Sequence, residues 1–137
     1  MSDYSALVRR FVDTYNRGDT QAILALVTPD VEFETPGGLE RGPQAAQRWA
    51  GKSTQEHALV RIEIERLVET GDQVVAFAER QMRWRETGEL ADASPSDAVM
   101  TIRGGKVARW QLLRNRREAL RLAGLEPTEP AAGEGGA

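Results

Sequence analysis

Residues 72–114 contain three runs rich in β-branched and aromatic side chains, and short turns separate these runs. One turn lies at Thr87 and Gly88, and the other spans residues 103–106 with two glycines at its centre. Apolar and polar residues that alternate between glycine turns are typical of an antiparallel meander. Such a sheet needs a cover on one face, and the segments before and after the meander are the candidates for it. The sequence therefore predicts an α+β fold.

The first third of the chain has helical periodicity. A recurrence of apolar residues at i, i+3 and i+4 predicts an amphipathic helix over residues 4–17 that ends at Gly18, and its buried stripe comprises Leu7, Val8, Phe11, Val12 and Tyr15. A second, short helix is predicted over residues 20–27, before Pro29. A third is predicted over residues 43–50, where proline suits the first helical position.

The remaining segments complete the predicted order of elements. Residues 31–35 alternate as a short strand, residues 39–42 are expected to be a loop, and residues 58–65 alternate as a strand with one packed face. Helical spacing returns over residues 115–123. We expect a strongly curved, largely antiparallel sheet wrapped around three N-terminal helices, which together form a cone.

Length and composition narrow the class of protein. The 137 residues suit a single domain, predicted over residues 1–125, and residues 126–137 have little to bury and are predicted to be a disordered tail. The absence of cysteine and the presence of one histidine, His57, argue against a metal site, and no cofactor is expected. No apolar run approaches the roughly 18 residues of a membrane span. The net charge of −3, with both signs interspersed, argues against nucleic acid as a partner. We expect a cytoplasmic protein.

Three stretches carry a resemblance to a known family. They read VRRFVDTYNRGDTQAILALVTPDVEFETPGG, GDQVVAFAERQMRWRETG and RGGKVARWQLLRNRREALRLAGL. Together, over Leu7 to Leu125, they resemble the SnoaL-like branch of the nuclear-transport-factor-2-like superfamily, whose members fold as a cone-shaped α+β barrel. That superfamily includes ketosteroid isomerases, polyketide cyclases, scytalone dehydratase, limonene epoxide hydrolase and domains with no chemistry, so the resemblance leaves the reaction open.

The isomerase site can be carried over residue by residue. Alignment of the N-R-G-D junction puts Phe11 where the isomerases have a tyrosine donor, and Thr35 stands in the place of their general base. Asp97 stands in the place of their protonated oxyanion-binding aspartate. A phenyl ring cannot donate and a threonine is no base near neutral pH, so two of the three roles are lost. This pattern argues against the isomerase mechanism.

The same orientation predicts which strand residues face the cone: Val75, Phe77, Glu79, Gln81, Asp97, Val99, Thr101, Trp110, Leu112 and Arg114. Glu79 interrupts an apolar face, and a carboxylate desolvated there would suit proton transfer. The alternatives are an ion pair between Glu79 and Arg114, or a face assignment displaced by one residue. Asp97 is the second candidate acid, with a solvated aspartate at a strand edge as its alternative.

The other predicted site residues would bind the substrate. Arg114 could hold an anionic group, or pair with Glu118 or Glu79. Tyr15 could direct its hydroxyl into the pocket mouth, or simply pack in the core. The remaining predicted lining residues are Phe11, Thr35, Phe77, Trp110 and Leu112. Tryptophans in such a fold either line the cavity or pack in the core or at a dimer interface, and the candidates are Trp49, Trp84 and Trp110.

Two hypotheses of function follow. One is a cofactor-free acid-base enzyme of the cyclase, dehydratase, isomerase or hydrolase type that acts on a small, largely apolar molecule. The other is a ligand-binding or dimerisation module without turnover. In either case the resemblance implies a homodimer through the outer sheet face, where Arg80, Met82 and Trp84 would be favoured contacts.

Overall fold

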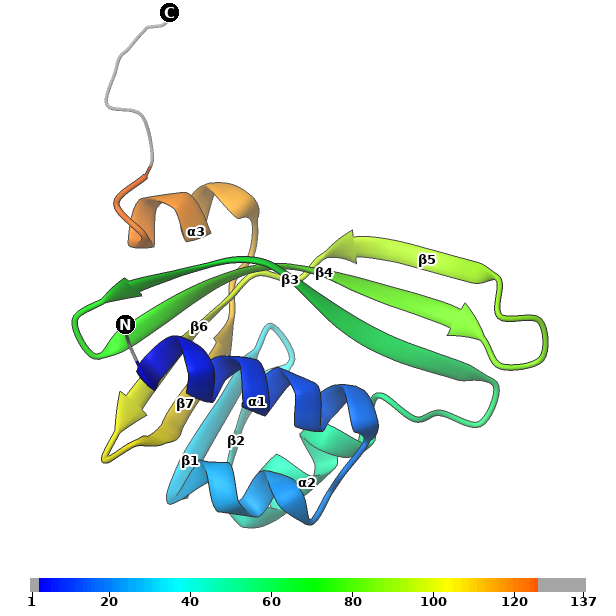
Figure 1. Ribbon diagram of the computed structural model, residues 1–137, viewed down its shortest axis with the longest axis horizontal. Coiled ribbons are helices and arrows are strands. Elements are labelled where there is room, and N and C mark those ends of the chain that lie inside the picture. The colour runs from blue at the N-terminus through cyan, green and yellow to red at the C-terminus, as the bar shows by residue number, and fades with distance from the viewer. Residues whose placement is uncertain (1–2, 126–137) are drawn as a thin grey trace, which may run out of the picture.

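The computed structural model describes residues 3–125, and the predicted tail lies outside the described residues. The helical elements are α1 (Asp3–Arg17), η1 (Ala22–Leu26), α2 (Pro43–Gly51) and α3 (Arg116–Leu122). The strands are β1 (Val27–Thr35), β2 (Gly38–Arg41), β3 (Ala58–Thr70), β4 (Gln73–Trp84), β5 (Leu90–Pro95), β6 (Ala98–Arg103) and β7 (Lys106–Leu112). These elements confirm the α+β class, and Figure 1 shows α1 and α2 beneath a strongly curved sheet.

The sheet has seven strands in the order β2-β1-β7-β6-β4-β3, and β5 pairs with β4 beyond the end of β6. All strand pairs are antiparallel except β1 and β7, which run parallel. The sheet is therefore mixed and open, and the parallel contact joins its first and last strands in the order of the chain. The predicted loop at residues 39–42 was wrong in part, because residues 38–41 pair with β1 as β2.

Two other boundaries differ from prediction. The short helix expected over residues 20–27 is a five-residue 3-10 helix, because the Asp19 carboxylate caps the backbone at Gln21 and Ala22 and the chain is already extended at Val27. The strand β1 therefore begins earlier than predicted. It accommodates Pro29 at a shift in register against β7, where a missing N–H breaks no ladder bond.

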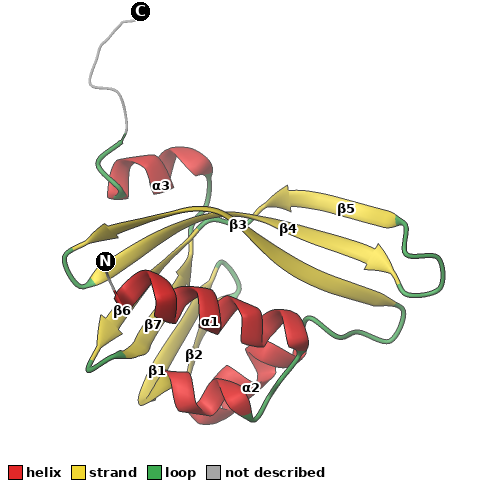
Figure 2. Ribbon diagram, viewed as in Figure 1, coloured by secondary structure: helices red, strands yellow, loops and turns green. Residues whose placement is uncertain are grey.

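Apolar side chains gather on both faces of the sheet. The main core lies between the sheet and the helices α1 and α2, and its strand residues include Val74, Ala76, Ala78, Ala98 and Met100. A second, smaller core lies on the outer face under α3, and it contains Val75, Phe77, Val99, Leu113 and Ala119. Figure 2 shows α3 on the opposite side of the sheet from α1. The C-terminal helix thus covers part of the outer face.

Candidate functional site

Five aromatic rings fill the middle of the cone, and Trp49 of α2 lies at their centre. Its ring is 4.5 Å from Phe11, 4.6 Å from Tyr15, 5.5 Å from Phe33 and 5.6 Å from Trp110, centroid to centroid. All five side chains are buried. Offset and tilted pairs at these distances are favourable beyond their buried area. The aromatic cluster therefore forms a continuous apolar wall contributed by α1, α2, β1 and β7.

Tyr15 is the one member of the aromatic cluster with a polar tip. It is the last member of the α1 stripe, next to Asn16, whose side chain donates to the Ile62 carbonyl and accepts from the Ile62 amide at 3.0 and 2.8 Å. Burial raises the pKa of the Tyr15 hydroxyl, and the nearby Arg80 guanidinium opposes that shift. The phenol therefore stays protonated at neutral pH and can donate a hydrogen bond.

The predicted inward face of β4 and β6 was wrong by one residue. Phe77, Val75 and Val99 belong to the second core, on the α3 side of the sheet. The alternate positions, such as Ala76 and Met100, face the cone instead. The alternative of a face displaced by one residue is the one that the structure supports for these two strands. On β7 the prediction holds, because Trp110 and Leu112 pack against the main core.

Glu79 follows Phe77 along the outer side of β4. Its carboxylate is partly exposed and accepts a 2.8 Å hydrogen bond from the Gln81 side chain, two residues along the same face. Glu79 therefore lies across the sheet from the aromatic cluster. The predicted pairing of Glu79 with Arg114 does not occur, since Arg114 pairs with Glu118 at 3.8 Å.

Asp97 is buried, with only 1% of its side chain exposed, but its carboxylate is fully engaged. Oδ1 accepts from the Ala78 amide at 2.9 Å, and Arg116 of α3 donates to Oδ2 at 2.7 Å and to Oδ1 at 3.0 Å. The guanidinium of Arg116 also donates to Glu65 at 3.0 Å and lies 5.3 Å from the centre of the Phe77 ring. These acids raise the pKa of Arg116 further, so its guanidinium stays charged. The structure thus gives Asp97 a role in holding α3, and the solvated aspartate expected as the alternative is wrong.

Arg80 lies on the inner side of β4, between Ala78 and Met82, whose side chains pack in or against the main core. The prediction that Arg80 and Met82 lie on the outer face was therefore wrong. Arg80 and Met82 continue the alternation of Ala76 and Ala78, so these side chains leave the strand on the same side. Arg80 is the charged residue that the structure brings to the polar end of the aromatic cluster.

Three predicted residues meet at another place. Thr35, Leu112 and Arg114 line a surface pocket of about 320 Å³ between the end of β1 and the start of α3, together with Glu34, Pro36, Gln111 and Glu118. The Thr35 hydroxyl already accepts from the Gly37 amide at 3.1 Å. The Arg114 amide donates to Glu118 at 3.0 Å. The Thr35 hydroxyl and the Arg114 backbone amide are therefore engaged within the protein.

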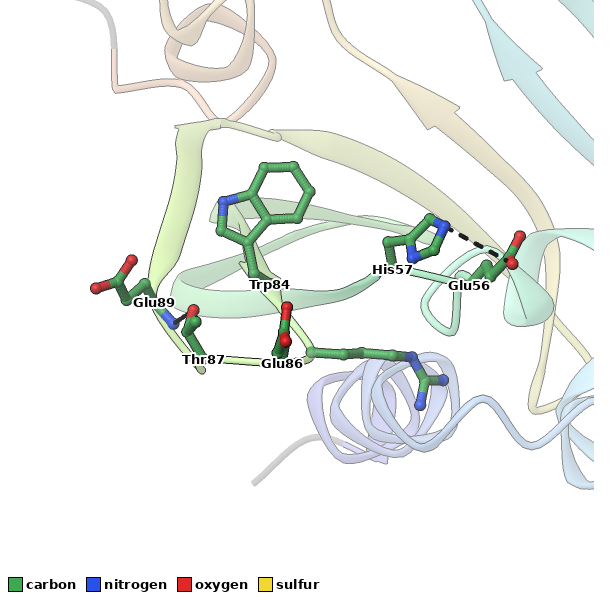
Figure 3. Close-up of a pocket in the computed structure, with 7 residues that line it drawn as sticks. Glu56, His57, Trp84, Glu86, Thr87 and Glu89 are labelled. Carbon is green, nitrogen blue, oxygen red and sulfur yellow. Dashed lines mark hydrogen bonds and ion pairs between the residues drawn. The ribbon is translucent and has the colours of Figure 1, made fainter.

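Figure 3 shows a wider surface pocket, of about 530 Å³, at the far end of the β4–β5 hairpin. Trp84 and the single histidine, His57, contribute to it, and His57 lies 3.7 Å from Glu56. Both of these side chains are more than four-fifths exposed. Exposed groups of this kind are hydrated and screened, which argues against proton transfer here.

Within residues 3–125, no group of three or more acidic or histidine side chains is placed to hold a metal ion. In the same part of the chain, no helix has the length and hydropathy needed to cross a bilayer. The sequence did not single out Phe33 or Arg116, and it singled out Arg80 only as a dimer contact. Phe33 shares its strand with two glutamates, and its inward position could have been read from their alternation.

Comparisons with protein families and solved structures show which known proteins this chain is similar to. The family model described as a SnoaL-like domain matches residues 8–110. The chain matches no curated protein sequence. A solved structure from Xanthomonas campestris, named a "putative polyketide cyclase", is 22% identical and covers 85% of this chain and 93% of its own, with a TM-score of 0.65. A protein of ketosteroid isomerase-like fold from Catenulispora acidiphila, in complex with trimethylamine, is 17% identical and covers 87% and 92%, with a TM-score of 0.67. At these identities the two structures show a shared fold.

Proposed function

Because this chain belongs to the SnoaL-like domain family, we propose that it binds a small, largely apolar molecule against the aromatic cluster, without acid-base turnover by Asp97 or Glu79. The observation that carries this proposal is the position of the two carboxylates. Asp97 is held by Arg116 and the Ala78 amide, and Glu79 lies on the opposite face of the sheet from Trp49. At one end of the aromatic cluster the fold places the hydroxyl of Tyr15 near the guanidinium of Arg80.

Binding inside the cone can be tested by nitrogen-15 NMR, because each of the three tryptophans gives one indole N–H signal. Camphor and 2-naphthamide are suitable neutral apolar probes. We expect both probes to shift the indole signals of Trp49 and Trp110 and to leave the signal of the exposed Trp84 unchanged. Shifts confined to Trp84, or none, would reject binding in the cone.

Substitution of each carboxylate tests the proposal that neither Asp97 nor Glu79 takes part in acid-base turnover. We expect Glu79→Gln to bind both probes within about twofold of the wild type, because its side chain lies outside the cone. Asp97→Asn keeps a side-chain oxygen that can accept from the Ala78 amide and should also keep binding in the folded protein. An enzymatic role would gain support from conversion of a cyclase, dehydratase or hydrolase substrate that either substitution abolishes.

We also propose that two copies pair through the outer sheet face. Leu59 and Leu90 are about half exposed, and they flank Arg83 in the neighbouring strands β3, β4 and β5. Exposed leucines beside an arginine are compatible with a self-complementary contact. Light scattering after size-exclusion chromatography tests this proposal: the wild type should have the mass of a dimer, and Leu59→Glu should be a monomer. A monomeric wild type would reject it.

A further inference from the structure

The side chain of Arg80 leaves the sheet toward the helices. Its neighbours in the adjacent strands are Ile62 of β3 and Ser94 of β5, and residues directly opposite in a sheet share a face. Ile62 belongs to the main core, together with Tyr15 and Trp49. The guanidinium is therefore positioned at the margin of the aromatic cluster, where most inward positions of the sheet are apolar.

The charge of Arg80 is weakly compensated. Its ion pair within the described residues is to Asp92, at 4.0 Å, and the side chains of Arg80 and Asp92 are 37% and 54% exposed. A guanidinium carries five N–H donors in a planar fork that matches a carboxylate. The Asp92 carboxylate, at 4.0 Å, engages few of these N–H donors. Donors of Arg80 thus remain available to a bound group.

Tyr15 of α1 supplies a second donor, near Arg80. The hydroxyl-bearing ring packs against Trp49, and the residue after it, Asn16, holds both backbone groups of Ile62. Since Ile62 is the strand neighbour of Arg80, this double hydrogen bond fixes the end of α1 relative to the guanidinium. The phenol and the guanidinium are therefore held together by the fold at the edge of an apolar wall.

We infer that Arg80 and Tyr15 form an oxyanion subsite, and that the molecule bound against the aromatic cluster carries a carboxylate on an aromatic or alicyclic body. This inference rests on the proposed function, because it assigns a polar group to the same bound molecule. A carboxylate would accept from the guanidinium fork and from the phenol while its apolar body contacts Trp49. Charge-assisted bonds of this kind favour the anion over a neutral isostere.

The test compares 2-naphthoate with 2-naphthamide, which have the same ring system and differ in charge. Dissociation constants are measured by NMR titration on the wild type, Arg80→Gln and Tyr15→Phe. We expect the wild type to prefer 2-naphthoate by about tenfold, and both variants to lose most of that preference while they bind 2-naphthamide as before. The matched control is Arg121→Gln, since Arg121 is exposed on α3, on the opposite side of the sheet from α1, and should leave both constants unchanged.

A second variant acts in the opposite direction. Asp92→Asn removes the carboxylate that competes for Arg80 and should tighten 2-naphthoate binding by about threefold, with no effect on 2-naphthamide. Equal affinity of the wild type for the two probes would overturn the oxyanion subsite and leave the apolar site standing. Failure of both probes to bind would overturn the proposed function and the subsite together. A preference for 2-naphthoate that survives Arg80→Gln would place the anion site elsewhere.

Discussion

Arg116 donates two hydrogen bonds, of 2.7 and 3.0 Å, to the Asp97 carboxylate and so holds α3 against the outer face of the sheet. The carboxylate is buried, whereas 43% of the arginine side chain is exposed. Loss of the arginine would leave a buried charge with one remaining partner, the Ala78 amide. The pair is therefore asymmetric. Without Arg116 the Asp97 carboxylate would be buried with one hydrogen-bond partner, whereas without Asp97 the Arg116 guanidinium would still be partly hydrated.

Arg116→Gln should destabilise the protein by about 2 kcal/mol, below the range for a fully buried pair because the arginine is partly hydrated. Urea unfolding measures this change. Arg114→Gln removes an exposed ion pair with Glu118 in the same region and should cost less than about 0.5 kcal/mol. Equal costs for the two arginines would contradict a structural role for the Asp97 pair.

Trp49→Ala should destabilise the protein by about 3–5 kcal/mol, because it removes the ring that the other four aromatic side chains contact. The same measurement on Trp84→Ala, at an exposed tryptophan, should give less than about 1 kcal/mol. The truncated protein should also bind indole, since an apolar cavity of this kind accepts a matching apolar ligand. A Trp49→Ala protein as stable as Trp84→Ala would show that the rings are not packed as described.

The alkaline limb of the stability profile should depend on Tyr15. Burial raises the pKa of its hydroxyl above the ordinary value of 10.0, so the folded protein holds the proton after the unfolded chain has lost it. The stabilisation is complete below about pH 10 and is lost as the pH rises through the folded pKa. We therefore expect the unfolding free energy of the wild type to fall more steeply between pH 9.5 and 11.5, about the tyrosine titration range, than that of Tyr15→Phe. Parallel profiles would exclude the shift.

Asn16→Ala should cost about 1–2 kcal/mol, because it removes both hydrogen bonds to the backbone of Ile62. Hydrogen exchange of the Ile62 amide should accelerate, whereas the Val60 amide, bonded to the Ser53 carbonyl, should be unaffected. Asn16→Asp keeps the acceptor for the Ile62 amide and should protect that amide better than alanine does. An unchanged Ile62 exchange rate in Asn16→Ala would show that water replaces the side chain without loss.

The family and the fold class were predictable from the sequence, and the family-model match confirms the first and the structure the second. The direction in which the side chains of β4 point could not be predicted from the sequence, for a physical reason. Residues 74–78 are all buried, because α1 and α2 cover one side of the strand and α3 covers the other. Where both faces are apolar, alternation carries no information on direction. On β7 the polar residues Arg109 and Gln111 alternate with Trp110, and there the inward side was predicted correctly.

The candidate site was predictable in part. Phe11, Tyr15 and Trp110 follow from the helix stripe and from the alternation of β7, and the structure brings them together around Trp49. The partner of Asp97 could not be predicted, because an arginine in the first turn of a surface helix has no local feature that distinguishes it from its neighbour Arg117. Contacts between residues in different elements depend on how those elements pack, which periodicity does not encode.

The parallel contact between β1 and β7 sets the order in which the chain can fold. Val27 lies beside Val107, so the N-terminal strand gains this neighbour only after nearly the whole domain has left the ribosome. Loop-closure entropy opposes a contact between such distant segments until the intervening strands are in place. The β3–β4 hairpin, whose pairing is local, is the natural place for folding to start. During synthesis one backbone edge of β1 thus awaits its partner strand, and a translational pause before Lys106 would prolong the exposure of that edge to other chains.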